Sequence, residues 1–228
     1  MERSGKFSAA FADYLYLLDR NYSSKSALKL VGDKYALPSN ERALLYRGVV
    51  AESVMEKRAR KRLKQFLPGT PVFVDGFNVC RTVGSYLCGN LVFEAMDGFL
   101  RDVSELHRKK LKWNILERSV CLLIQFLKEN NAGNIQFYFD KPISHSGKMV
   151  ELFRGIMKES QMKGEAATVF SPDHCLIEVR SGLVCTSDSH IIDQAKVPVF
   201  DLAHAVLKAN FQADIFSLQK HFKKHRGN

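Results

Sequence analysis

Residues 72–79 read Val-Phe-Val-Asp-Gly-Phe-Asn-Val, and this stretch decides the fold that the sequence predicts. Val72-Phe73-Val74 is a short β-branched and aromatic run of the kind found in buried strands. An aspartate and a glycine follow it directly and end the strand. A similar pattern returns at Phe137-Tyr138-Phe139-Asp140 and at 183–188, Leu-Val-Cys-Thr-Ser-Asp. The sequence therefore predicts several buried strands that each end near an aspartate.

Helical patterns separate these strands. We predict strands over 72–74, 91–93, 135–139, 167–170, 182–185 and 197–200, and helices over 116–127, 148–158, 191–195 and 202–209. Strands that alternate with helices predict an α/β domain with a mainly parallel sheet flanked by helices.

The segment before the first strand has helical periodicity. Spacings of three and four residues join Phe7, Phe11, Tyr14, Leu15 and Leu18. A second helix is expected to begin near Ser24, and a third near Ser39, which continues into the basic residues 57–64. Two prolines and a glycine at 68–71 then break the helix. We predict a helical, basic domain over 1–67, an α/β domain over 68–217 and a basic tail over 218–228.

The net charge of +10 is concentrated at the two ends of the 228-residue chain. Residues 1–67 hold 14 basic and seven acidic residues, and residues 218–228 hold four basic residues and no acidic one. Basic ends beside an acid-bearing body suit a protein that attracts a polyanion. Charge alone favours the simpler explanation of two solvated basic faces. The candidate RNA-binding residues of the first segment are Lys57, Arg58, Arg60, Lys61, Arg62 and Lys64. Three short helices resemble a DNA-reading helix-turn-helix only loosely.

Several classes of protein are disfavoured by composition. The sequence has no apolar run of about 18 residues and no apolar core of a signal peptide at its start, so we predict a cytoplasmic protein without a membrane span. Its five cysteines have no C-x-x-C spacing, so we predict reduced thiols rather than a zinc site or disulfides. The phosphate-binding pattern G-x-x-x-x-G-K-[ST] does not occur.

The strand-end aspartates are the candidate chemical site. Ligands of open parallel sheets bind at the carboxyl ends of the strands, where Asp75, Asp140 and Asp188 are expected to converge. Crowded carboxylates repel one another unless a cation joins them, and Mg²⁺ or Mn²⁺ prefers such oxygen ligands. A single strand-end aspartate is more simply a turn residue or a helix cap. Three on one sheet favour a site.

Two motifs resemble those of a known superfamily. Asp75-Gly76-Phe77-Asn78-Val79 resembles the Asp-Gly-Tyr-Asn motif after the first strand of NYN nucleases, which belong to the PIN superfamily. Thr186-Ser187-Asp188 resembles the late Thr/Ser-x-Asp motif, and the two occur in the same order. The whole chain also resembles an uncharacterised prokaryotic family of domains of unknown function, in which a short helical domain precedes a PIN-like domain.

The resemblance implies a metal-dependent ribonuclease that uses Mg²⁺ or Mn²⁺ to position a water for attack on an RNA phosphodiester. It implies that Asp75, Asp140 and Asp188 are catalytic residues and metal ligands. Asn78, Thr186 and Ser187 would orient these acids or contact phosphate.

Two further pairs of residues are candidates. Asp97 and Asp102 are further candidate ligands, with a turn residue and a surface charge as the alternative. Ser144 and Ser146 are expected to bind phosphate at a helix N-terminus, or Ser146 to cap the helix.

The sequence departs from the NYN pattern at one place. NYN nucleases often carry paired aspartates before a helix in the second half, whereas Asp173-His174-Cys175 has a single aspartate. A non-catalytic RNA- or ribosome-binding protein of the same fold is the main alternative. A phosphatase is less favoured because Asp75-Gly76-Phe77 lacks the second acid of a D-x-D pattern. The expected partner is single-stranded or structured RNA, with no membrane, and a monomer and a homodimer both stay open.

Overall fold

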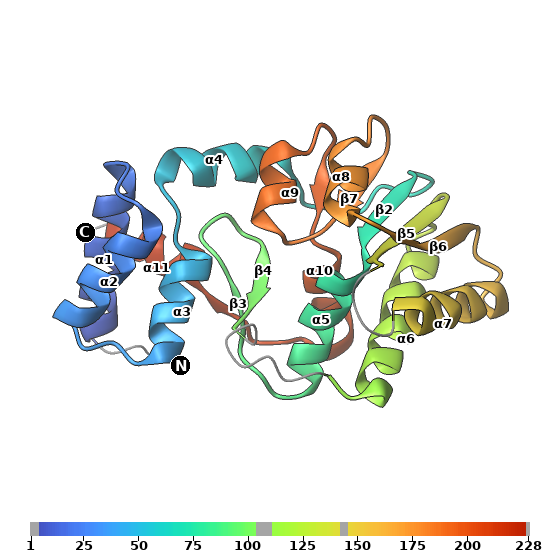
Figure 1. Ribbon diagram of the computed structural model, residues 1–228, viewed down its shortest axis with the longest axis horizontal. Coiled ribbons are helices and arrows are strands. Elements are labelled where there is room, and N and C mark those ends of the chain that lie inside the picture. Colours follow the sequence, from blue (N-terminus) through green and yellow to red (C-terminus); the bar gives the residue numbers. More distant parts are fainter. Residues whose placement is uncertain (1–4, 104–110, 142–145, 227–228) are drawn as a thin grey trace. The chain divides into compact units, whose positions relative to one another are not determined.

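The computed structural model describes residues 5–103, 111–141 and 146–226 (Figure 1). The chain forms two compact units. Unit 1 comprises Met1–Arg60, Asn90–Lys109 and Asp214–Asn228, and unit 2 comprises Lys61–Gly89 and Lys110–Ala213. The predicted limits 1–67, 68–217 and 218–228 differ from these bounds and stay a prediction about which segments fold independently. Over the described residues, no helix has both the length and the apolarity of a membrane span.

Unit 1 combines helices with a small sheet. Its elements are α1 (Gly5–Asp19), α2 (Ser24–Lys34), α3 (Ser39–Gly48), α4 (Glu52–Lys61, its last residue in unit 2), β3 (Val92–Glu94), β4 (Leu100–Asp102), β9 (Phe216–Ser217) and α11 (Leu218–Arg226). Strand β3 is antiparallel to β4 and parallel to β9. The predicted apolar stripe of the first helix is confirmed, because all five of its residues are buried in the unit's core.

The prediction that the third helix continues into the basic cluster was wrong. Helix α3 ends at Gly48, and Val49 is extended, with φ of −105° and ψ of 130°. A Cβ at position 48 would lie 2.3 Å from Leu218 and 2.5 Å from Phe93, so close packing requires glycine there. The carbonyl of Gly48 accepts a hydrogen bond of 2.9 Å from the N–H of Met96. Tertiary packing thus interrupts the helix before α4.

The C-terminal segment, for which the sequence predicts a basic tail, is part of unit 1. Strand β9 pairs with β3, and α11 follows it directly. Leu218 and Phe222 are buried in the core of the unit. These two apolar residues anchor a helix whose sequence is otherwise strongly basic.

Unit 2 has the predicted α/β architecture, but the strand expected at 91–93 is not part of it, because β3 belongs to the small sheet of unit 1. The elements of unit 2 are β1 (Arg62–Leu63), β2 (Val72–Asp75), α5 (Gly76–Leu87), α6 (Trp113–Glu129), β5 (Ile135–Asp140), α7 (Ser146–Glu159), β6 (Gly164–Val169), α8 (Pro172–Ile177), β7 (Leu183–Cys185), α9 (Ser189–Gln194), β8 (Val199–Phe200) and α10 (Leu202–Phe211). The six strands form a parallel sheet in the order β1-β8-β7-β2-β5-β6. Figure 1 shows α5, α6, α7 and α10 on one side of this sheet and α8 and α9 on the other. The predicted fold class is confirmed. The five cysteines are free thiols, as expected.

The strand order changes direction between β2 and β7. From β2 the chain adds β5 and then β6 on one side, and it then returns to place β7 and β8 on the other side. Val74 of β2 is in register with Phe137 on one neighbour and with Cys185 on the other. In α/β proteins, ligands commonly bind at the carboxyl ends of the two strands between which the order reverses.

Helix α5, which the sequence analysis did not identify, begins directly after β2. Asp75 is its N-cap and accepts a hydrogen bond from the N–H of Asn78. A Cβ on Gly76 would lie 2.4 Å from the ring of Phe139, so only glycine allows the helix to start this close to β5. The Asp-Gly pair therefore both ends a strand and starts a helix.

Candidate functional site

Asp75 lies at the end of β2, beside the reversal in strand order. Its side chain is buried and its two oxygens have different donors. Thr186, just after β7, donates its hydroxyl to Oδ2 at 3.0 Å, and the N–H of Asn78 donates to Oδ1 at 3.3 Å. The two predicted motifs are thus brought together on adjacent strands, 111 residues apart in the sequence.

Asn78 links the same two motifs through its side-chain oxygen. Its Oδ1 accepts hydrogen bonds from the N–H of Ser187 at 2.9 Å and from the hydroxyl of Ser187 at 3.1 Å. The hydroxyl of Thr186 in turn accepts one from the N–H of Asp188 at 3.0 Å. The oxygen of Asn78 is therefore committed to the 186–188 loop, and its NH₂ group is the part with hydrogens to donate to a ligand.

Asp188 is the N-cap of α9. Its Oδ1 accepts hydrogen bonds from the backbone N–H groups of His190 and Ile191, at 2.8 and 3.3 Å. Both aspartates of the two motifs are thus helix caps, which was the simpler explanation of such residues. The cap uses one carboxylate oxygen of Asp188, and within the described part of the chain Oδ2 has no hydrogen-bond donor.

Four acidic residues of unit 2 influence one another electrostatically. The pKa of Asp75 is raised to about 7, chiefly by burial, with further contributions from the charges of Asp188 and Asp173, while the hydrogen bonds from Thr186 and Asn78 oppose the rise. Burial also raises the pKa of Asp140, and Asp173 adds to this effect. The ionised form of Asp75 is therefore costly unless a cation lies beside it, and without one the protonated form is favoured up to about pH 7.

Asp140 and Asp173 lie on the β5–β6 side of Asp75. Tyr138 is in register with Asp75, so Asp140 is two residues further along its strand. Asp173 is in the first turn of α8 and is exposed. The sequence analysis noted Asp173 only as a single aspartate where NYN nucleases often have two, and did not include it among the site residues. Its position after a strand of the sheet was the available signal.

Phe170 and Lys141 form an exposed pair that the sequence analysis missed. The ring of Phe170 follows β6 directly and is 80% exposed. The ammonium of Lys141, which follows β5, lies 4.7 Å from the centre of this ring. The sequence analysis counted Phe170 as a strand residue, and nothing in its apolar neighbours signals exposure. An aromatic ring and a cation therefore stand beside Asp140 at the carboxyl ends of these strands.

The described residues do not contain a complete metal site made of protein side chains alone. Among them, no group of three or more His, Cys, Asp or Glu side chains is placed to hold a metal ion. Mg²⁺ is commonly held by only one or two carboxylates, with water and substrate phosphate oxygens as its other ligands. Asp75 and Asp188 fit that kind of site.

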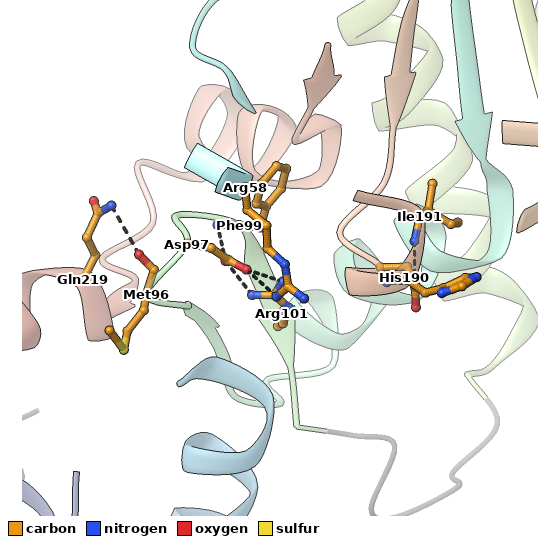
Figure 2. A network of polar contacts seen from close by, with 9 residues as sticks. Arg58, Met96, Asp97, Phe99, Arg101, His190, Ile191 and Gln219 are labelled. Atoms are coloured by element: carbon orange, nitrogen blue, oxygen red, sulfur yellow. Dashed lines mark hydrogen bonds and ion pairs between the residues drawn. The ribbon is translucent and has the colours of Figure 1, made fainter. Parts of the chain in front are cut away.

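Asp97 and Asp102 belong to unit 1, whereas the other candidate ligands belong to unit 2. Figure 2 shows the side chains of Arg58 and Arg101 pointing toward the carboxylate of Asp97. Arg101 binds both carboxylate oxygens, at 2.7 and 2.8 Å, and Arg58 binds Oδ2 at 3.0 Å. All three side chains are buried. Burial alone would raise the pKa of Asp97, but the two guanidinium groups outweigh it and lower this pKa. Asp97 is thus the centre of a buried ion-pair cluster.

The basic residues predicted to bind RNA have different environments. Arg58 is buried in the cluster with Asp97. Lys61 donates to the backbone carbonyls of Ile192 and Asp193, at 3.0 and 2.6 Å, and so caps the end of α9. Arg62 contacts Nδ1 of His204 at 3.2 Å. Exposed positions are occupied by Lys57, Lys64 and Arg60, the last of which lies 3.7 Å from Glu56.

The predicted phosphate-binding serines are only partly described. Ser146 is the first residue of α7 and is buried, and its hydroxyl donates to the carbonyl of Lys141 at 3.4 Å. Ser144 lies outside the described residues.

The raised pKa of Asp75 predicts a pH dependence of stability. Because the folded state holds this proton up to about pH 7 while an ordinary aspartate loses it near 3.8, the free energy of unfolding should fall as pH rises between these values. In buffer with a chelator, we expect the melting temperature to fall by about 5 °C more between pH 5 and pH 8 in the wild type than in Asp75→Asn. Equal pH profiles of the two proteins, measured by calorimetry, would contradict this.

Comparison with known proteins gives the family but no activity. Residues 64–205 match the model described as "Domain of unknown function (DUF5616)", and residues 6–61 match "Protein of unknown function (DUF434)". The chain is 30% identical over 188 residues to "Uncharacterized protein MJ0935" of Methanocaldococcus jannaschii, which covers 81% of this chain and 88% of that protein. No solved structure matches significantly.

Proposed function

Because the chain belongs to the DUF5616 family, whose description states no activity, we propose a function from the site itself: a divalent-metal-dependent ribonuclease of PIN-like fold. The observation that carries this proposal is the buried Asp75 at the point where the strand order reverses, held by Thr186 and next to the charge of Asp188. The resemblance of both motifs to NYN nucleases supports the same activity.

The donor set fits Mg²⁺ or Mn²⁺. Asp75 and Asp188 would hold the ion, and a bound cation would oppose the burial and the neighbouring charges of Asp188 and Asp173 that raise the pKa of Asp75. When bound, such an ion polarises a water and neutralises charge that develops on the phosphate.

The protein's own residues position these groups. Thr186 and the N–H of Asn78 fix the carboxylate of Asp75, because each donates to a different oxygen. The backbone N–H groups at the start of α9 fix Asp188 in the same way. The NH₂ group of Asn78 would donate to a phosphate oxygen, and Asp140 would accept a proton or a water hydrogen further along the edge.

Phe170 and Lys141 support a nucleic-acid substrate. Exposed aromatic rings stack with the bases of single strands, and a nearby lysine attracts the phosphate. Strands β6 and β2 are separated by β5, so two strand spacings of about 4.8 Å separate the ring's strand from that of Asp75. Bases bound on Phe170 would thus belong to the same strand of RNA as a phosphate at Asp75.

Phe170→Ala is expected to weaken the binding of single-stranded RNA by about 5- to 100-fold, because it removes a stacking surface. Fluorescence anisotropy with a labelled oligouridylate, in chelator so that nothing is cleaved, measures the affinity. Phe170→Trp should retain it. Tyr22→Ala, at an exposed tyrosine of unit 1, is the matched control. The same affinity for Phe170→Ala and the wild type would rule out this role.

A non-catalytic RNA-binding protein is the second candidate. The observation in its favour is that the described residues contain no group of three metal-ligating side chains. To separate the candidates, the full-length protein is incubated with labelled single-stranded RNA and Mn²⁺ or Mg²⁺, with a chelator arm. We expect cleavage only with the metal. Binding without cleavage in every metal would favour the second candidate.

A further inference from the structure

A separate cavity of about 570 Å³ lies within unit 2, at the β1–β8 end of the sheet. Its walls come from β1 and the residues after it, from the end of β8, from α10 and from the last part of α6. This volume falls within the range of about 300–1,000 Å³ that is typical of small-molecule sites. None of the candidate acids described above lines it.

One wall of the cavity is aromatic. The ring centre of Phe66 lies 5.3 Å from that of Phe200 and 6.3 Å from that of Phe126. Phe126 and Phe200 are buried, whereas Phe66 is half-buried and keeps accessible area for a ligand. A flat aromatic group such as a nucleobase can stack on this wall through the face of its ring.

The cavity also has basic residues from two separate elements. Arg62 belongs to β1 and Lys64 follows it, while Lys208 belongs to the last turn of α10. Arg62 contacts Nδ1 of His204, one helical turn before Lys208, at 3.2 Å. Basic groups that face one cavity from two elements repel one another, and an anion between them relieves this repulsion.

The lining also holds one acidic residue, Asp201, which offsets only one of these three positive charges. Asp201 is buried and is the N-cap of α10, where its Oδ1 accepts a hydrogen bond from the N–H of His204 at 3.0 Å. The lining therefore carries three cations and one carboxylate, apart from His204. An anionic group of about two charges complements it.

We propose that this cavity binds a phosphate monoester attached to a nucleobase, with the phosphate near Arg62, Lys64 and Lys208 and the base against Phe66. The ligand is a free nucleoside monophosphate or the phosphorylated end of an RNA strand, which share this chemistry. The binding requires no metal and does not depend on the activity proposed for Asp75.

The test is calorimetric titration of the full-length protein with uridine monophosphate, uridine and inorganic phosphate, in buffer with a chelator. We expect uridine monophosphate to bind at least tenfold more tightly than either of the other two. Lys208→Glu should weaken the binding of uridine monophosphate by about tenfold or more. The substitution replaces an exposed cation with an anion, which repels the phosphate. Lys158→Glu, an exposed lysine in the last turn of α7, is the matched control and should bind like the wild type.

Two more arms identify the base-binding wall and the source of the ligand. Phe66→Ala should weaken the binding of uridine monophosphate but leave the affinity for inorganic phosphate unchanged. The source of the ligand follows from comparing uridine monophosphate with a short oligouridylate that carries a terminal phosphate. Tighter binding of the oligouridylate indicates that the ligand is an RNA strand end, and tighter binding of uridine monophosphate indicates a free nucleotide. Equal affinities for uridine and uridine monophosphate, or no effect of Lys208→Glu, would overturn the proposal. Because no arm measures cleavage, a failure here is distinguishable from a failure of the ribonuclease proposal.

Discussion

Asp75→Asn is expected to lower metal-dependent cleavage of RNA by about a thousandfold or more. The substitution removes the carboxylate charge from the centre of the candidate site, and charge stabilisation by a bound divalent ion contributes several kcal/mol to such reactions. The fold should persist, because Asn has the same shape and can still accept a hydrogen bond from Thr186 or from the N–H of Asn78. Initial cleavage rates with Mn²⁺ measure the effect.

Two controls make this result specific. Glu159→Gln removes one negative charge from an exposed position at the end of α7 and should leave the rate unchanged. Calorimetric titration with Mn²⁺ should show binding to the wild type and to Glu159→Gln, and weakened binding to both Asp75→Asn and Asp188→Asn. A folded Asp75→Asn protein that cleaves RNA at the wild-type rate would refute the assigned role.

Asp97→Asn is expected to lower the free energy of unfolding of unit 1 by about 3–5 kcal/mol. The substitution leaves the buried guanidinium groups of Arg58 and Arg101 without their shared counter-charge, which is far costlier than breaking an exposed ion pair. Because the folded-state pKa of Asp97 is lowered, its contribution is present at neutral pH and is lost as the pH falls below the usual value of 3.8. Urea unfolding at pH 7 and at pH 3 measures both effects.

The matched control is Asp33→Asn, which breaks an ion pair of similar length in the same unit. Asp33 and Arg42 are 2.9 Å apart but are 61% and 30% exposed, so water screens their charges. Its removal should cost less than about 1 kcal/mol. If the two variants lose equal stability, burial is not what makes the Asp97 cluster important.

The arrangement of unit 2 was largely predictable, but its local details were not. Apolar runs such as 72–74 and 135–139 are strong strand signals because both faces of a parallel strand are buried. Helix α5 was missed because Gly76 has low helix propensity, and its role depends on the distance to Phe139. Strand β1 was missed because Arg62 and Leu63 look helical, and only pairing with β8 makes them a strand.

The candidate site likewise has features that the sequence predicts and features that depend on tertiary contacts. The positions of Asp75, Asp140 and Asp188 at strand ends follow from the sequence, since apolar runs end there. The sequence does not indicate that Asp97 pairs with Arg58, because these residues are 39 positions apart and meet only after folding. The exposure of Phe170 and the use of Lys61 as a helix cap likewise depend on neighbours that are distant in the sequence.

The sequence by itself determined the fold class, the helical N-terminal segment and the two motifs, because periodicity and strand-ending residues are local properties. Only the tertiary structure decided the strand order, which places Thr186 against Asp75. It also decided which of the basic residues between 57 and 64 are buried or bonded and which are exposed. The physical reason is that the energetic contribution of a charged side chain depends on whether water or an opposite charge surrounds it. The sequence does not show these surroundings, because they form only when the chain folds.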